Sequence, residues 1–100
     1  MIKHKFNAKI TERDGIKFHS RKEAYYYDEL KSKVEAGLVL FFHRQVPIDL
    51  PGGVKYRVDF LEFHSDGTVH YVDVKGYKTP EYKAKKKMVE AIYPITIEEK

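Results

Sequence analysis

Hydrophobic positions recur with a helical period in one part of the chain and with a strand period in another. After Ser20, apolar or aromatic side chains return every three to four positions, at Tyr27, Leu30 and Val34. Ser20 and Glu23 have the spacing of a capping box, in which each side chain bonds a backbone N–H of the other. Gly37 is a typical residue for ending a helix. The pattern therefore predicts a first helix over about residues 20–36.

Three segments with strand-like composition follow, over residues 39–50, 54–64 and 68–75. Pro47 predicts an edge position or a bulge for the first of them, because proline has no N–H to donate to a neighbouring strand. Pro51-Gly52-Gly53 predicts a turn between the first and second strands.

A second helix is predicted from Thr79-Pro80 to about Ile92, with proline in its first turn. Residues 94–97 could add a last strand, whereas residues 1–18 show no strong period and predict an irregular N-terminal arm with a turn at Asp14-Gly15. The order is helix, three strands, helix, strand. This order predicts one α/β (α+β) domain over residues 1–100, with a mixed sheet flanked by helices.

Composition narrows the class of protein. The 100 residues leave no room for a second core, and the absence of cysteine excludes disulfides, thiolate metal sites and thiol catalysis. The longest apolar run, Leu38 to Phe42, is too short to span a membrane, and no secretory signal is evident. We therefore expect a soluble, cytoplasmic protein with no membrane partner.

Positive charge is concentrated in two stretches. The chain has 19 Lys and Arg against 15 Asp and Glu, a formal net charge of +4, and the excess lies in residues 1–22 and 75–87. Such stretches are typical either of solvated lysine-rich surfaces or of a surface that binds a polyanion such as nucleic acid. Charge alone does not decide between them.

The loop between the second and third strands decides whether two aspartates meet. A two-residue Asp66-Gly67 turn would put Asp59 and Asp73 on opposite faces, whereas a three-residue Ser65–Gly67 loop with a bulge pairs them directly. The second register also gathers four apolar side chains into one patch: Val58, Phe60, Val72 and Val74. The hydrophobic pattern therefore favours the three-residue loop.

Opposed carboxylates destabilise a sheet unless a cation lies between them. Lys75 would project from the same face as Asp73, about 6.6 Å further along the strand. Glu23 lies on the apolar stripe of the first helix, so it faces the core. The alternatives are that Glu23 only closes the capping box, and that the aspartates are exposed residues paired with Arg57 or Lys75.

A helix glutamate, a strand aspartate and (Asp/Glu)-x-Lys on the next strand resemble the signature of the PD-(D/E)xK nuclease superfamily, which has the restriction-endonuclease-like fold. The matching residues are Glu23, Val58-Asp59 and Asp73-Val74-Lys75. The chain is also similar to a small phage-associated family of uncharacterised nucleases. That similarity runs through Lys17–Ala24, Gln45, Tyr56–Phe60, Asp73–Gly76 and Thr79–Lys83. Two departures are Val58 where proline is common and Asp73 where glutamate is more usual.

The resemblance implies catalytic roles for Glu23, Asp59, Asp73 and Lys75. Asp59, Asp73, the Val74 carbonyl and Glu23 would bind Mg²⁺ or Mn²⁺, since hard oxygen ligands suit these ions. The ion would activate a water and polarise the scissile phosphate. Lys75 would orient that water, and whether one or two ions bind stays open.

The resemblance also implies a DNA partner and no nucleotide cofactor. We expect contacts with the DNA backbone from six side chains: Lys78, Lys83, Lys86, Lys87, Arg21 and Lys22. Gln45 and Tyr82 would support the site. Similarity to small Holliday-junction resolvases implies a homodimer that cuts branched DNA in phage DNA metabolism, in the host cytoplasm. The alternatives are a nucleic-acid-binding module that keeps the nuclease fold without catalysis, and an interaction protein with an acidic partner.

Overall fold

The computed structural model describes residues 10–100. Its elements in chain order are β1 (Thr11–Arg13), β2 (Ile16–Phe18), α1 (Arg21–Glu35), β3 (Val39–Leu50), the 3₁₀ turn η1 (Pro51–Gly53), β4 (Val54–His64), β5 (Val69–Asp73), α2 (Pro80–Ile92) and β6 (Ile97–Glu99). From α1 onward, the order of helix, three strands, helix and strand is the predicted one. The α+β class is confirmed.

The prediction of an irregular N-terminal arm is wrong for residues 11–18. They form an antiparallel hairpin, β1 and β2, whose turn is made by Asp14 and Gly15 with positive φ angles of 52° and 78°. The hairpin is attached to α1, because Arg13 pairs with Asp28 at 2.9 Å and Tyr27 donates to Asp14 at 2.8 Å. Strands of three residues are too short to show a period, so these tertiary contacts had no sequence signal. The rest of the predicted arm, residues 1–9, lies outside the described residues.

The other strands form a mixed four-stranded sheet in the order β3-β4-β5-β6, with β6 parallel to β5 and the remaining pairs antiparallel. The long β3 is an edge strand, which confirms the edge position predicted from Pro47. Two strands differ from their predicted bounds. β5 ends at Asp73, two residues early, and the last strand is Ile97–Glu99 because Ile97 is the residue that pairs with Tyr71.

The hairpin between β4 and β5 has the three-residue register. Phe60 is opposite Val72 and Phe63 is opposite Val69. Gly67 adopts a φ of 89°, and its N–H donates to the His64 carbonyl at 3.0 Å. The same register, continued by one residue, places Asp59 opposite Asp73, as the hydrophobic pattern predicted.

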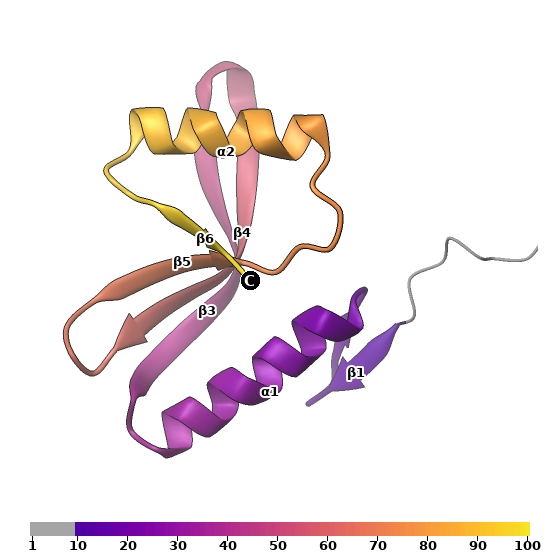
Figure 1. Cartoon of the computed structure of the whole chain (residues 1–100), viewed down its shortest axis with the longest axis vertical. Helices are drawn as coiled ribbons and strands as arrows, with labels where there is room; N and C mark the ends of the chain where they lie inside the picture. The colour runs from indigo at the N-terminus through magenta and orange to yellow at the C-terminus, as the bar shows by residue number, and fades with distance from the viewer. Residues whose placement is uncertain (1–9) are drawn as a thin grey trace, which may run out of the picture.

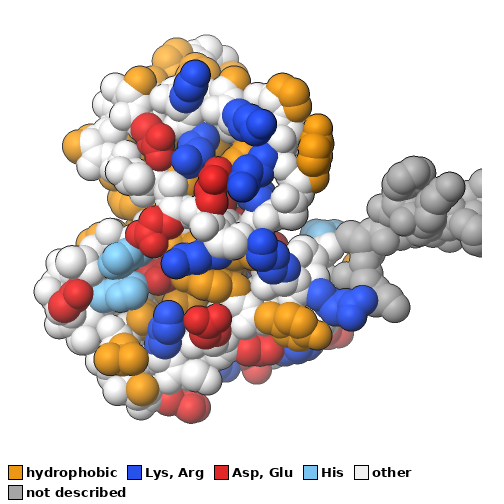
Figure 2. Space-filling model, viewed as in Figure 1, with side chains coloured by type: hydrophobic (Ala, Val, Ile, Leu, Met, Phe, Trp, Pro, Cys, Tyr) orange, Lys and Arg blue, Asp and Glu red, His pale blue; other side chains and the backbone are white. Residues whose placement is uncertain are grey.

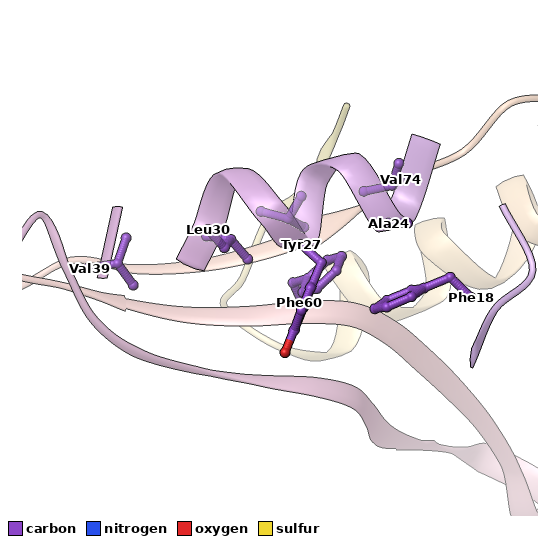
Figure 3. Close-up of a cluster of buried hydrophobic side chains, with 8 residues drawn as sticks. Phe18, Ala24, Tyr27, Leu30, Val39, Phe60 and Val74 are labelled. Carbon is purple, nitrogen blue, oxygen red and sulfur yellow. The ribbon is translucent and has the colours of Figure 1, made fainter. Parts of the chain in front are cut away.

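Two hydrophobic clusters hold the domain, one under each helix. Figure 1 shows α1 along the lower half of the sheet and α2 across the far end of the β3–β4 hairpin. Phe60 is fully buried beneath α1, where it lies close to Tyr27 and Leu30 (Figure 3). The second cluster joins Val58 to Val89 of α2 and Ile97 of β6. Along the length of the strands, α1 therefore covers one half of the sheet and α2 covers the other half.

Both helices begin at the predicted caps. The Ser20 side chain accepts the Glu23 N–H at 3.2 Å, and Thr79 accepts the Tyr82 N–H at 3.0 Å. Within residues 10–100, no helix combines the length and the apolar character that a membrane crossing needs.

Gly37 ends α1 with a φ of 78°, and its N–H donates to the Val34 carbonyl while Leu38 donates to Lys33. We expect Gly37→Ala to lower the free energy of unfolding by about 1–2 kcal/mol, because a Cβ is strained in the left-handed region. Urea denaturation measures the loss. Gly76→Ala is the matched control, because a Cβ there meets no atom within 4 Å and its φ is not positive. A similar loss in both variants would contradict this account.

Candidate functional site

Four elements meet near the middle of the sheet: the first turn of α1, the middle of β3, the middle of β4 and the end of β5. The two opposed aspartates are linked there through backbone groups. The Asp59 N–H donates to Asp73 Oδ1 at 2.9 Å, and the Val74 N–H donates to Asp59 Oδ2 at 2.9 Å. Each carboxylate thus accepts a hydrogen bond from a backbone N–H of the other strand or of the residue that follows it. These bonds stabilise two negative charges that would otherwise repel each other.

Asp73 forms the buried floor of this arrangement. It is fully buried, and its Oδ2 accepts a hydrogen bond from the Tyr56 hydroxyl. Burial raises the pKa of Asp73 above the ordinary range, although the Tyr56 hydrogen bond and the Asp59 N–H act in the opposite direction. Asp73 therefore holds Asp59 in place from below. Tyr56 is a site residue that the sequence analysis did not single out, although it lies in one of the matching blocks.

Gln45 connects the two carboxylates that lie nearer the surface. Its Nε2 donates to Glu23 Oε2 and to Asp59 Oδ1, both at 3.2 Å. Its own φ is +52°, a left-handed conformation that is rare for a residue inside a strand. This unusual backbone lies opposite Asp59, where it brings the amide between the two acids. The observed contact of the Glu23 carboxylate is therefore with Gln45 rather than with the backbone of Ser20.

Glu23 is in a low-polarity environment beside another acid. Its side chain is 13 % exposed. Burial first, and the charge of Asp59 second, raise the pKa of Glu23, while Arg44, with Nη2 at 3.7 Å from Oε2, opposes the shift. The carboxylate therefore holds a proton more readily than an exposed glutamate does.

Lys75 joins the group from the loop after β5. Its Nζ lies 3.7 Å from Asp59 Oδ2 and 5.2 Å from the centre of the Tyr82 ring. Tyr82 also stacks on Tyr56, with ring centres 6.2 Å apart, and donates to Glu99. Tyr82 therefore both packs in the α2 cluster and contacts Lys75.

A cleft of about 430 Å³ opens onto Glu23, Gln45 and Asp59. Three positive or titratable side chains also line this cleft: Lys17, His19 and Arg44. The Arg44 guanidinium lies 4.5 Å from the Phe18 ring centre, and its Nε is buried with no hydrogen-bond partner among residues 10–100. No motif signalled Arg44, whose position depends on the β2 strand that was not predicted.

The predicted metal ligands were Asp59, Asp73, Val74 and Glu23. In the described part of the chain, no three His, Cys, Asp or Glu side chains lie together in a way that could hold a metal ion. Glu23 and Asp59 face the cleft around a shared amide donor, whereas Asp73 is below them with both oxygens hydrogen-bonded. Glu23 and Asp59 supply oxygen atoms of the kind that Mg²⁺ and Mn²⁺ accept as ligands, and the Gln45 amide lies between the two carboxylates.

The six side chains predicted to contact DNA have different surroundings. Lys78 and Lys86 both pair with Glu99, at 3.5 and 3.8 Å. Lys83 and Lys87 are exposed on α2, and Arg21 is exposed at the start of α1. Lys22 donates to the Lys75 carbonyl at 3.2 Å, so it lies beside the site. Figure 2 shows Lys and Arg side chains over α2 with acidic side chains between them.

The fold and the site define a small α+β domain with a paired-carboxylate and lysine cluster beside a cleft. The chain belongs to the family described as "Protein of unknown function (DUF1064)", which it matches over residues 3–98. No curated protein matches it. No solved structure matches it either.

The raised pKa of Glu23 predicts a pH effect on stability in the absence of divalent ions. Because the folded chain binds this proton more tightly than the unfolded chain, the contribution of Glu23 to the free energy of unfolding falls as pH rises from about 4 through the raised pKa. We therefore expect Glu23→Gln to gain stability relative to the natural chain as pH rises through this window. Urea unfolding in EDTA measures the difference, and Glu35→Gln, an exposed glutamate on the same helix, should show none. If the stability gained by Glu23→Gln relative to the natural chain became smaller as pH rises, the pKa of Glu23 would not be raised and the prediction would be wrong.

Proposed function

We propose that this protein is a Mg²⁺- or Mn²⁺-dependent endodeoxyribonuclease. The observation that carries the proposal is the arrangement of three side chains from separate segments: Glu23 and Asp59 line one cleft and share the Gln45 amide, and Lys75 Nζ lies 3.7 Å from Asp59 Oδ2. A metal-dependent hydrolase acting on phosphodiesters uses carboxylates to bind the cation and a positive group to offset charge on the phosphate. Lys17 and Arg44, which also line the cleft, provide positive charge for the incoming polyanion.

The site residues divide this work. When bound, a divalent ion supplies Lewis-acid activation of the phosphate. Glu23 and Asp59 would hold it, and Asp73 and Tyr56 fix the position of Asp59. Lys75 orients the attacking water and stabilises negative charge on the phosphate oxygens, since its ammonium already lies next to Asp59. Gln45 separates the two acids when no ion lies between them.

The test is hydrolysis of labelled duplex, single-stranded, flapped and four-way DNA in Mg²⁺ or Mn²⁺. We expect cleavage by the natural chain and loss of cleavage in Lys75→Ala. Lys33→Ala is the matched control, because Lys33 lies in the last turn of α1 and pairs with Glu29. Absence of cleavage of every DNA by the natural chain would refute the enzyme proposal, and cleavage that survives in Lys75→Ala would assign it to another site or protein.

For the assembly, we propose a homodimer that acts on branched DNA in phage DNA metabolism, in the host cytoplasm. An uncovered face of the sheet supports a second copy as partner. Phe41 stacks on Phe63 at 4.4 Å, Val69 is opposite Phe63, and Phe41 and Val69 are about half exposed. Contiguous apolar surface of this kind is typical of an interface. Sedimentation should show a dimer that Phe41→Glu dissociates, and a monomer at all concentrations would exclude it.

A second candidate is a nucleic-acid-binding module without catalysis. The observation in its favour is Asp73, which is buried with both oxygens hydrogen-bonded rather than directed to the cleft. DNA binding by the natural chain with no cleavage in either ion would select this candidate.

A further inference from the structure

A second cleft lies between β4 and the start of α2, and we call it the β4–α2 cleft. It has a volume of about 350 Å³ and is lined by Lys55, Arg57, Thr79, Lys85 and the rings of Tyr56 and Tyr82. None of its three cations belongs to the set that the sequence assigned to DNA. One acid, Glu81, also lines it and pairs with Lys85 at 3.3 Å. The lining therefore keeps a positive balance.

This cleft is directly connected to the candidate site. Arg57 Nη1 donates to the Gln45 carbonyl at 3.3 Å, and the amide of the same Gln45 contacts both Glu23 and Asp59. On the inner side, Tyr56 donates to Asp73 and stacks on Tyr82, which lies under Lys75. A group bound between Arg57 and Lys85 would thus be within one or two side chains of the proposed catalytic groups.

The cations are available to a ligand. Arg57 is exposed, and among residues 10–100 only its Nη1 forms a hydrogen bond, which leaves the other guanidinium nitrogens for the forked pair that arginine makes with phosphate. The Lys55 side chain is 56 % exposed and pairs with Asp49, which is itself 77 % exposed. Exposed pairs of this kind are weak, so a phosphate can replace the carboxylate at small cost.

We propose that the β4–α2 cleft binds a backbone phosphate of the nucleic-acid strand next to the one that is cut. This inference rests on the proposed function, because it places a neighbouring part of the same substrate. It assigns the anchoring of the strand to Lys55, Arg57 and Lys85, in place of the exposed Lys83 and Lys87 on α2. Tyr56 and Tyr82 form the inner side of the cleft, and the hydrogen bond from Tyr56 to Asp73 fixes the position of the cleft relative to the candidate site.

The experiment measures binding of a fluorescent four-way DNA by the full chain, by anisotropy in Ca²⁺ so that binding is read without turnover. Three variants each remove one cleft charge: Lys55→Gln, Arg57→Gln and Lys85→Gln. Lys31→Gln and Lys33→Gln remove the same charge on α1, outside the cleft, and are the matched controls. Affinity is measured between about 50 and 200 mM salt, because each lost phosphate contact lowers the slope of log affinity against log salt by about 0.7–0.9.

We expect each cleft variant to bind DNA more weakly and to lower the slope by the amount expected for about one phosphate contact. The controls should keep the slope of the natural chain. Because Arg57 also touches Gln45, Lys85→Gln is the decisive variant, and circular dichroism verifies its fold. Equal slopes in cleft and control variants, with the natural chain still binding and cutting DNA, would overturn this inference alone. Failure of the natural chain to bind any DNA would overturn the proposed function and this inference with it.

Discussion

Asp59→Asn should remove both hydrolysis and the response of the protein to divalent ions. Asp59 is the one carboxylate that contacts Gln45, the Val74 N–H and Lys75 together. Its replacement by a neutral side chain of the same size keeps the packing and removes the charge that an ion and Lys75 share. We expect a loss in rate on the order of 10²–10³-fold or more.

The same variant tests ion binding without any substrate. An ion at about 100 times its dissociation constant raises the free energy of unfolding by about 2.7 kcal/mol. We expect this gain from Mn²⁺ in the natural chain and its absence in Asp59→Asn, both measured by urea denaturation. Asp49→Asn, an exposed aspartate on β3, should keep the gain. If Asp59→Asn kept it as well, the ion would bind elsewhere and the proposed roles of Glu23 and Asp59 would be wrong.

Phe60→Ala should cause the largest loss of stability. The Phe60 ring is fully buried, with the ring centres of Tyr26 and Phe42 at 5.1 and 6.1 Å. Truncation of such a ring costs about 3–5 kcal/mol, a large part of the roughly 5–15 kcal/mol that stabilises a domain. Chemical denaturation measures it. Tyr77→Ala, at a ring that is 82 % exposed, should change stability by less than about 0.5 kcal/mol. Comparable losses in the two variants would show that the α1 cluster is not the core.

The sheet and helices could be predicted because each depends on a repeated pattern. The period of α1 and the apolar alternation at Val58, Phe60 and Val72 determine which faces are buried, and burial of the wrong face is costly enough to exclude the other register. The approach of Asp59 to Asp73 follows from that register. Its prediction therefore required no knowledge of the site itself.

The detailed geometry of the site could not be predicted in the same way. Whether Asp73 faces the cleft or accepts the Tyr56 hydroxyl depends on side-chain rotation and on how the strands separate after Asp73, and alternation carries no information about either. The same holds for Arg44, whose place against Phe18 depends on the short hairpin β1–β2. The left-handed Gln45 has no local signal, since glutamine is not a residue that favours positive φ.

The backbone amides of Asp59 and Val74 donate to carboxylate side chains. Their hydrogen–deuterium exchange therefore depends on whether those side chains hold their positions, and only indirectly on the strand ladder. An ion or DNA strand that pulled Asp59 toward the cleft would release the Val74 amide to solvent, while the Asp59 amide stayed protected by Asp73. Exchange resolved at these two residues would thus record rearrangement of the acidic side chains in the intact protein, before any bond is cut.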